Sequence, residues 1–210
     1  MTVRDRNVSG AVLIGGRSTR MGTPKATLAL DAIPLWQRAL DTLIPLCSDV
    51  ALIGAIPGLT CPNSLQVIPD DPDGEGPLGG IMTALAASLS NSTLVIAVDY
   101  PFVQLRLLEA LIERCGDSAW AVCGRNGSFL EPLVACYDRR CLDPIRAMFD
   151  EGEVRTHRLF DRVPSYVLSD EEYQAVDPGR LSQLNVNTPE DWSRATQMIS
   201  QIASSGAGSR

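Results

Sequence analysis

The sequence predicts an α/β fold with a mostly parallel central sheet, formed as one domain. The chain has 210 residues, of which 45% are hydrophobic, and this suits a single domain with an ample core. Short apolar runs alternate with longer stretches of helical spacing, the pattern of parallel strands joined by helices. A glycine-rich turn follows the first apolar run, at the edge where such sheets bind ligands. Together these observations predict an α/β ligand-binding domain.

The alternation of strands and helices is regular over the first 115 residues. Runs rich in Val, Ile and Leu mark buried strands, and apolar residues spaced three and four apart mark helices. Strands are expected at 8–14, 50–54, 65–68 and 94–98, and helices at 34–46, 78–89 and about 104–115.

The pattern is less regular in the second half of the chain. Strands are expected at 119–123, 133–137 and 163–168, and a helix at 138–149. Thr188 can cap a last helix, with Pro189 in its first turn and two acids following. The small polar residues 204–210 predict a disordered tail, so the domain is expected to span 1–203.

The composition argues against several classes of partner and site. A net charge of −7 without a polybasic stretch disfavours nucleic acid and anionic membranes, and no apolar run approaches the roughly 20 residues of a membrane span. We expect a cytoplasmic protein, since no secretory signal is readable. Six cysteines lack zinc-site spacing and are expected to be buried and reduced. The single histidine, His157, gives histidine catalysis little support.

The turn after the first strand has the features of a phosphate site. Gly15 and Gly16 allow backbone amides to approach an anion, and Arg17, Arg20 and Lys25 gather three cations in an acidic chain. The segment lacks the GK[ST] of a P-loop and the GxGxxG of a dinucleotide fold. A triphosphate is therefore the expected ligand, with a solvated basic turn as the alternative.

Two acidic positions are expected at the same edge. Asp99 ends the apolar run 94–98, where its carboxylate could hold Mg²⁺ against phosphate oxygens, and a turn or capping aspartate is the alternative. Asp70 opens an acidic, glycine-containing loop in which a carboxylate could accept the N1 and N2 donors of guanine. Gly76 in that loop allows close backbone contact, although a plain surface turn is also open.

Asn185 and Asn187 precede the last helix. Alternation places both on one face of a short predicted strand, from which they could face the cleft. They are candidates for the acceptor side or for support of the metal.

Five segments taken in order carry a family resemblance. LIGGRSTRMGTPK, DDPDGEGPLGGI, VDYPF, LEPLVACY and NVNTPEDW resemble the molybdenum cofactor guanylyltransferases across nearly the whole chain. The resemblance implies a three-layer, Rossmann-like fold of the nucleotide-diphospho-sugar transferase type. It also implies transfer of GMP from GTP to the terminal phosphate of molybdopterin, with release of pyrophosphate and with Mg²⁺ as cofactor.

The resemblance also implies roles for individual residues. It places the nucleotide on Leu13, Ile14 and Gly15, its phosphates on Lys25, its guanosine end on Asp70, the metal on Asp99 and the pyrophosphate on Arg20.

The chain departs from its relatives in the first loop, where it has Ile14 and Pro24. An MGxPK ending also occurs in molybdopterin cytidylyltransferases, so this loop leaves GTP and CTP open. The segment from Glu131 to Tyr137 resembles the guanylyl branch and favours GTP.

Two other functions remain as alternatives. One is transfer of CMP or another nucleotide to molybdopterin or to a sugar phosphate. The other, from a different class, is a non-catalytic module that binds GTP or delivers the cofactor. We expect a monomer that contacts the proteins of molybdoenzyme maturation.

Overall fold

A seven-stranded sheet lies at the centre of the protein, whose computed structural model describes residues 7–15, 24–56, 59, 61–62, 65–71 and 74–206. The strand order across the sheet is β5-β4-β1-β6-β8-β7-β9. The strands are β1 (Val8–Leu13), β4 (Asp49–Ile53), β5 (Gln66–Ile68), β6 (Ser92–Ala97), β7 (Ala121–Asn126), β8 (Phe129–Asp138) and β9 (Ser165–Val167).

The sheet is mostly parallel, as the sequence predicts. β4 and β6 flank β1 in parallel, β5 is parallel to β4, and β9 is parallel to β7. β8 is the exception, because it returns from β7 through a hairpin and inserts between β6 and β7 antiparallel to both. The ends of β1 and β6 therefore lie side by side at one carboxyl edge.

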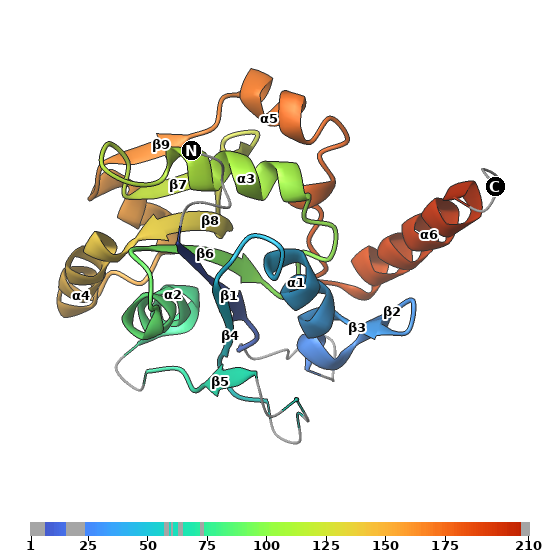
Figure 1. Ribbon diagram of the computed structural model, residues 1–210, viewed down its shortest axis with the longest axis horizontal. Helices are drawn as coiled ribbons and strands as arrows, with labels where there is room; N and C mark the ends of the chain where they lie inside the picture. Colours follow the sequence, from blue (N-terminus) through green and yellow to red (C-terminus); the bar gives the residue numbers. More distant parts are fainter. Residues whose placement is uncertain are drawn as a thin grey trace.

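Helices cover both faces of the sheet and give three layers (Figure 1). α1 and α3 pack on one face, with α5 against α3, while α2 and α4 pack together on the other. The helices are α1 (Leu35–Leu43), α2 (Gly76–Ala87), α3 (Leu105–Arg114), α4 (Leu142–Asp150), α5 (Asp170–Val176) and α6 (Pro189–Gly206). Short 3-10 turns occur at η2 (Lys25–Thr27), η3 (Arg139–Cys141), η4 (Thr156–Asp161) and η5 (Leu181–Gln183).

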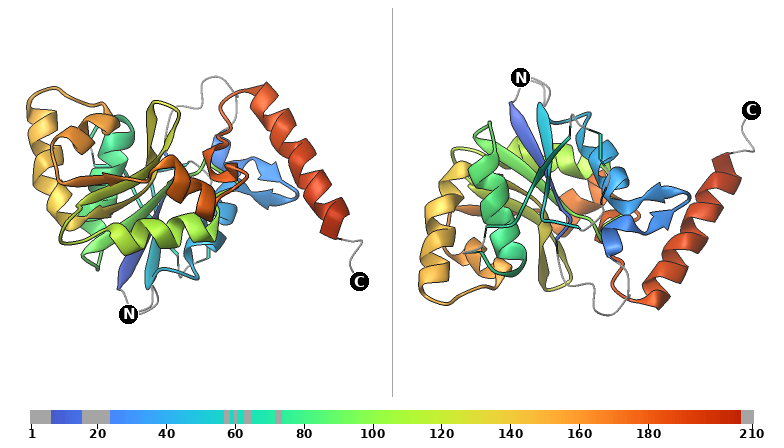
Figure 2. Two further views of the ribbon diagram at one scale, coloured as in Figure 1. Left: turned by 90° about the horizontal axis from the view of Figure 1, so that it is seen from above. Right: turned by 90° about the horizontal axis from the view of Figure 1, so that it is seen from below.

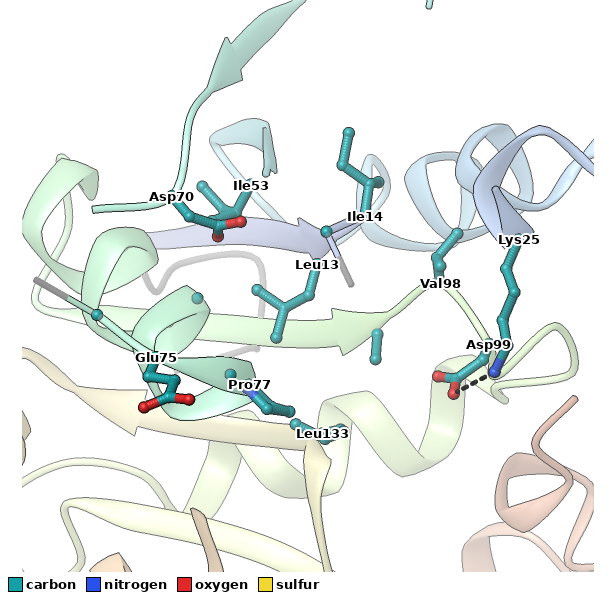
Figure 3. Close-up of a pocket in the computed structure, with 15 residues that line it drawn as sticks. Leu13, Ile14, Lys25, Ile53, Asp70, Glu75, Pro77, Val98, Asp99 and Leu133 are labelled. Carbon is teal, nitrogen blue, oxygen red and sulfur yellow. Dashed lines mark ion pairs between the residues drawn. The ribbon is translucent and has the colours of Figure 1, made fainter. Parts of the chain in front are cut away.

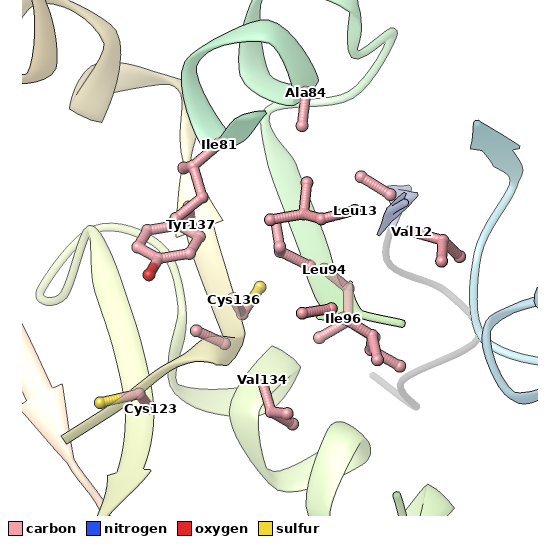
Figure 4. Packing of buried hydrophobic residues seen from close by; sticks show 14 of the residues in the cluster. Val12, Leu13, Ile81, Ala84, Leu94, Ile96, Cys123, Val134, Cys136 and Tyr137 are labelled. Atoms are coloured by element: carbon pink, nitrogen blue, oxygen red, sulfur yellow. The ribbon is translucent and has the colours of Figure 1, made fainter. Parts of the chain in front are cut away.

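The core is built on β1 and β6, whose apolar side chains are buried on both faces (Figure 4). Such two-sided burial is what a central parallel strand requires, and it explains their continuous apolar sequences. Tyr137 of β8 is fully buried, and its hydroxyl donates to the carbonyl of Pro132 at 2.6 Å. All six cysteines are free, and four of them are buried as expected, whereas Cys47 and Cys61 are half-buried.

The β2–β3 hairpin and the helix α5 are absent from the sequence-based expectations. β2 (Ala29–Leu30) and β3 (Ile33–Pro34) have two residues each, too few for alternation to be visible, and Asp31 and Ala32 between them have positive φ. α5 begins with a capping box in which Ser169 and Glu172 exchange hydrogen bonds.

The last helix, α6, stands away from the sheet and lies beside the β2–β3 hairpin (Figure 2). It continues to Gly206, past the expected end at residue 203, because no breaker occurs before that glycine. Along the described part of the chain, no helix is both long and apolar enough to cross a membrane.

Candidate functional site

A pocket of about 570 Å³ opens at the carboxyl edge of β1 and β6 (Figure 3). This volume falls within the roughly 300–1,000 Å³ of small-molecule sites. Asp70 and Asp99 lie toward opposite ends of the lining. The pocket is lined by Leu13, Ile14, Gly15, Lys25, Ile53, Asp70, Gly74, Glu75, Gly76, Pro77, Gly80, Ala97, Val98, Asp99 and Leu133.

The structure thus brings together most of the candidates named from the sequence. Leu13, Ile14, Gly15, Lys25, Asp70, Gly76 and Asp99 all line the pocket. Gly16, Arg17 and Arg20 lie outside the described residues. The candidates Asn185 and Asn187 do not line the pocket, but they contact residues at its Asp99 end.

The backbone that follows β1 is hydrogen-bonded to the end of the neighbouring strand β4. The amides of Ile14 and Gly15 both donate to the carbonyl of Ile53, at 2.8 and 3.3 Å. A Cβ on Gly15 would lie 2.7 Å from Oδ2 of Asp70, so a larger residue there would displace that carboxylate from its present position. Gly54 has φ of +113°, and a Cβ built on it would lie 2.5 Å from the amide nitrogen of Gly15, so the two backbones pack closely.

Asp70 lies at the β1–β4 side of the pocket, close to Gly15 and Gly80. Partial burial raises the pKa of its carboxyl above the ordinary value. No ion pair of the described residues involves Asp70. Asp70 lines the cavity, and its carboxylate can accept hydrogen bonds, the chemistry that a donor-bearing base edge requires.

The first turn of α2 closes another wall of the pocket. Gly76 has φ of +62°, a conformation that favours glycine, and Glu75 and Pro77 beside it also line the cavity. The amino end of α2 thus faces the pocket with its free amides and positive dipole end. These features favour an anionic ligand, although Glu75 adds a negative charge to the same wall.

Lys25 and Asp99 form an ion pair at the far end, with 3.5 Å between Nζ and Oδ2 (Figure 3). Lys25 Nζ also donates to Asn187 Oδ1 at 2.5 Å. Asp99 Oδ1 is buried and has no hydrogen-bond partner among the described residues. Burial raises the pKa of Asp99, and the Lys25 ammonium opposes part of that rise. A buried carboxylate oxygen without a partner among the described residues, on an aspartate that lines the pocket, fits a divalent cation.

The segment around Val186 joins this end of the pocket to α6. The predicted short strand at Asn185–Asn187 is wrong. With the rest of the described chain, the backbone of Val186 makes one hydrogen bond, from its amide to the carbonyl of Asp99 at 2.8 Å, and these residues form no ladder. Asn185 hydrogen-bonds to Tyr100. The predicted cap of the last helix is confirmed, since Thr188 and Asp191 exchange hydrogen bonds.

Tyr100 and Glu131 form a polar pair that no candidate from the sequence includes. The Tyr100 hydroxyl donates to Glu131 Oε2 at 2.8 Å, and burial raises the pKa of Glu131 despite this bond and another from Asn126. Glu131 also lies close enough to Asp99 for the two charges to interact. The signal for Glu131 in the sequence is an acid just before the apolar run from Leu133 to Tyr137.

Metal binding at this edge would depend on few protein ligands. Among the described residues, no cluster of three or more His, Cys, Asp or Glu side chains could hold a metal ion. Asp99 is the acidic residue placed for it, so most ligands of a bound ion would come from phosphate and water.

Comparisons with known proteins agree with this geometry. The profile of the MobA-like NTP transferase domain matches residues 10–166. The probable molybdenum cofactor guanylyltransferase of Chloroflexus aggregans is 35% identical over 193 residues, which cover 88% of this chain and 91% of that protein. The relative of the same name from Pelotomaculum thermopropionicum is 31% identical, with 90% and 92% covered.

A solved structure has the same fold. Molybdopterin-guanine dinucleotide biosynthesis protein A from Archaeoglobus fulgidus superposes with a TM-score of 0.77 at 26% identity, covering 92% of this chain and 99% of that one.

Proposed function

The chain belongs to the family of MobA-like NTP transferases, and on this premise we propose that it transfers GMP from GTP to the terminal phosphate of molybdopterin. The observation that carries the proposal is the pairing of Lys25 with Asp99, whose second oxygen is unpartnered, at one end of a nucleotide-sized pocket with Asp70 toward the other. The names of the relatives support guanylyl transfer in molybdenum cofactor synthesis.

The residues of the pocket divide between the two ends of GTP. The backbone of Leu13, Ile14 and Gly15, with the Asp70 carboxylate, would hold the guanosine end. Gly76 and the amino end of α2 would lie along the nucleotide. Gly16 and Arg20 keep their proposed roles at the phosphates from the sequence alone.

Lys25 is proposed to neutralise charge on the phosphates as pyrophosphate leaves. In the reaction, an oxygen of the molybdopterin phosphate bonds to the α-phosphorus, and the bond from that phosphorus to the bridging oxygen breaks. The bonding pair leaves on pyrophosphate, where a lysine ammonium stabilises the added charge. No protein nucleophile is needed, so these residues act by orientation and electrostatics.

Asp99 is proposed to hold Mg²⁺ through its carboxylate, whose Oδ1 lacks a hydrogen-bond partner among the described residues. A single carboxylate combined with phosphate oxygens is a usual set of ligands for Mg²⁺. When bound there, Mg²⁺ would supply neutralisation of the triphosphate and alignment of the α-phosphate. A Mycobacterium tuberculosis protein, solved in complex with manganese, has the same fold at 18% identity and a TM-score of 0.64.

Asn185 is proposed to lie on the acceptor side. It is exposed next to the pocket and reaches Tyr100, the residue after Asp99. An enzyme of this kind would work in the cytoplasm as a monomer that hands its product to the proteins of molybdoenzyme maturation.

The direct test is product formation from purified protein, GTP, Mg²⁺ and molybdopterin. We expect pyrophosphate release together with a guanine dinucleotide of the cofactor, identified by mass. A parallel panel with CTP, ATP and UTP tests the base. Faster turnover with CTP would favour the cytidylyl alternative, while saturable GTP binding without pyrophosphate would favour a non-catalytic module.

A further inference from the structure

The Lys25 ammonium lies between two oxygen-bearing side chains. Its Nζ is 2.5 Å from Asn187 Oδ1 and 3.5 Å from Asp99 Oδ2. A bound Mg²⁺ would lie closer to its oxygen ligands, at about 2.0–2.1 Å, but the ammonium already places positive charge between the same two side chains. The protein without nucleotide therefore holds a cation from its own sequence against Asp99.

The two oxygen-bearing residues are fixed by their backbone. Val186 donates to the carbonyl of Asp99 at 2.8 Å, which ties the end of β6 to the segment that carries Asn187. The amide of Asn187 donates to Asp191 Oδ2 at 3.1 Å, within the cap of α6. These bonds hold Asp99 and Asn187 facing one ammonium, although they are 88 positions apart in sequence.

The chemistry of the two side chains suits a hard cation. A carboxylate and an amide carbonyl are the oxygen ligands that Mg²⁺ and Mn²⁺ accept. Asp99 Oδ1 is buried without a hydrogen-bond partner among the described residues, so one further acceptor is available beside the ammonium. The ammonium satisfies only part of this oxygen set.

We propose that Asp99 and Asn187 form one cation position, that Lys25 holds it in the nucleotide-free protein, and that a divalent cation replaces the ammonium when a triphosphate binds Lys25. The inference rests on the proposed function, since it assumes that Lys25 moves to a phosphate. Asn187 becomes a ligand of the cation in the loaded protein and the positioning residue of Lys25 before loading.

The exchange couples the binding of the nucleotide to the binding of the divalent cation. An ammonium and a divalent ion at the same carboxylate repel strongly in a partly buried site, so each excludes the other. The triphosphate removes that conflict by giving Lys25 another anion. Nucleotide and divalent cation should then strengthen each other's binding by the same factor, because coupling between two ligands is reciprocal.

The test measures Mn²⁺ binding to the full-length protein by the EPR signal of the free ion. Lys25→Met keeps the length of the side chain and removes its charge. Without nucleotide, this variant should bind Mn²⁺ on the order of tenfold more tightly than the wild type, because the competing charge is gone. Arg158→Met, at an exposed arginine of η4, removes one positive charge elsewhere and should match the wild type.

A second variant tests Asn187. Lys25→Met combined with Asn187→Ala should lose most of the gain, and Asn187→Ala alone should weaken Mn²⁺ binding in the presence of GTP. If Lys25→Met bound Mn²⁺ no better than Arg158→Met, the exchange would be refuted. An unchanged gain without Asn187 would also overturn the shared position.

The Asn187→Ala arm remains decisive even if Lys25→Met does not fold, because Lys25 is intact in it. Mn²⁺ binding needs no transfer reaction, so the inference and the proposed function can fail separately. If the variants bound Mn²⁺ as predicted but the wild type transferred no GMP, the proposed function alone would be refuted. If the wild type transferred GMP but the variants bound Mn²⁺ as the wild type does, the inference alone would be refuted.

Discussion

At the scale of single residues, the two oxygens of Asp99 have different surroundings. Oδ2 is 3.5 Å from the Lys25 ammonium, while Oδ1 is buried and lacks a hydrogen-bond partner among the described residues. A buried acceptor without a partner costs free energy unless a ligand satisfies it. The arrangement therefore favours binding of a ligand at Asp99 over the stability of the free protein.

The substitution Asp99→Asn tests whether the Asp99 carboxylate contributes to the rate of transfer. The amide has nearly the same size but only one oxygen and no charge, so it should lower the rate of pyrophosphate release by about 100-fold or more, as loss of electrostatic stabilisation does. Steady-state kinetics with GTP and molybdopterin measure this rate. The matched control, Asp143→Asn at a largely exposed aspartate of α4, should leave it unchanged. Near-normal turnover of Asp99→Asn would remove this aspartate from the mechanism.

Asp70 predicts a pH dependence of GTP affinity. Burial raises the pKa of Asp70, so this carboxyl takes up its proton at a higher pH than an exposed aspartate does. The protonated form loses an acceptor for the donors of guanine, so affinity should fall as pH decreases through that raised pKa and should be full above it. Titration calorimetry with GTP at several pH values measures the effect. Asp70→Asn should bind GTP weakly and without this dependence; an identical pH profile in that variant would contradict the assignment.

At the scale of elements, the start of α2 depends on close packing of glycines. A Cβ on Gly79 would lie 2.6 Å from the carbonyl carbon of Gly74, well inside contact distance with backbone. This contact holds the loop from Asp70 against the first turn of the helix, and both line the pocket. The glycines of this segment therefore have a packing role beside any contact with the nucleotide.

Gly79→Ala should destabilise the fold by roughly 1–3 kcal/mol, the usual cost of overpacking. Alanine is the better helix former by about 1 kcal/mol, but the clash with backbone should outweigh this gain. Urea unfolding followed by circular dichroism gives the difference. Gly179→Ala is the control, since its Cβ would meet only a leucine side chain at 3.4 Å. A Gly79→Ala protein as stable as the wild type would show that this loop yields easily.

Elements also show where prediction from sequence succeeds and where it stops. β1 and β6 were predictable because strands buried on both faces have continuous apolar sequences. β8 starts at Phe129, four residues before the predicted start, because Glu131 and Pro132 have the composition of a loop. The pairing of β8 with β6 ends at Val134, so the missing amide of Pro132 breaks no bond of that ladder.

At the scale of the whole molecule, the carboxyl edge of the sheet was predictable and the contacts across it were not. Glycines and charges after apolar runs placed Gly15, Lys25 and Asp99 at one edge. The contact of Asn187 with Lys25 joins residues 162 positions apart, and no local pattern indicates such a pair. The insertion of β8 between β6 and β7 is likewise set by tertiary packing.

The most direct test of the central claim follows the phosphorus atoms of GTP. Wild-type protein is given molybdopterin, Mg²⁺ and GTP labelled at either the α- or the γ-phosphorus. Attack at the α-phosphorus predicts that the α label appears in the dinucleotide cofactor and the γ label in pyrophosphate, and that Asp99→Asn slows both transfers by about 100-fold or more. Release of the γ label as free phosphate, with the α label retained in GDP, would contradict guanylyl transfer.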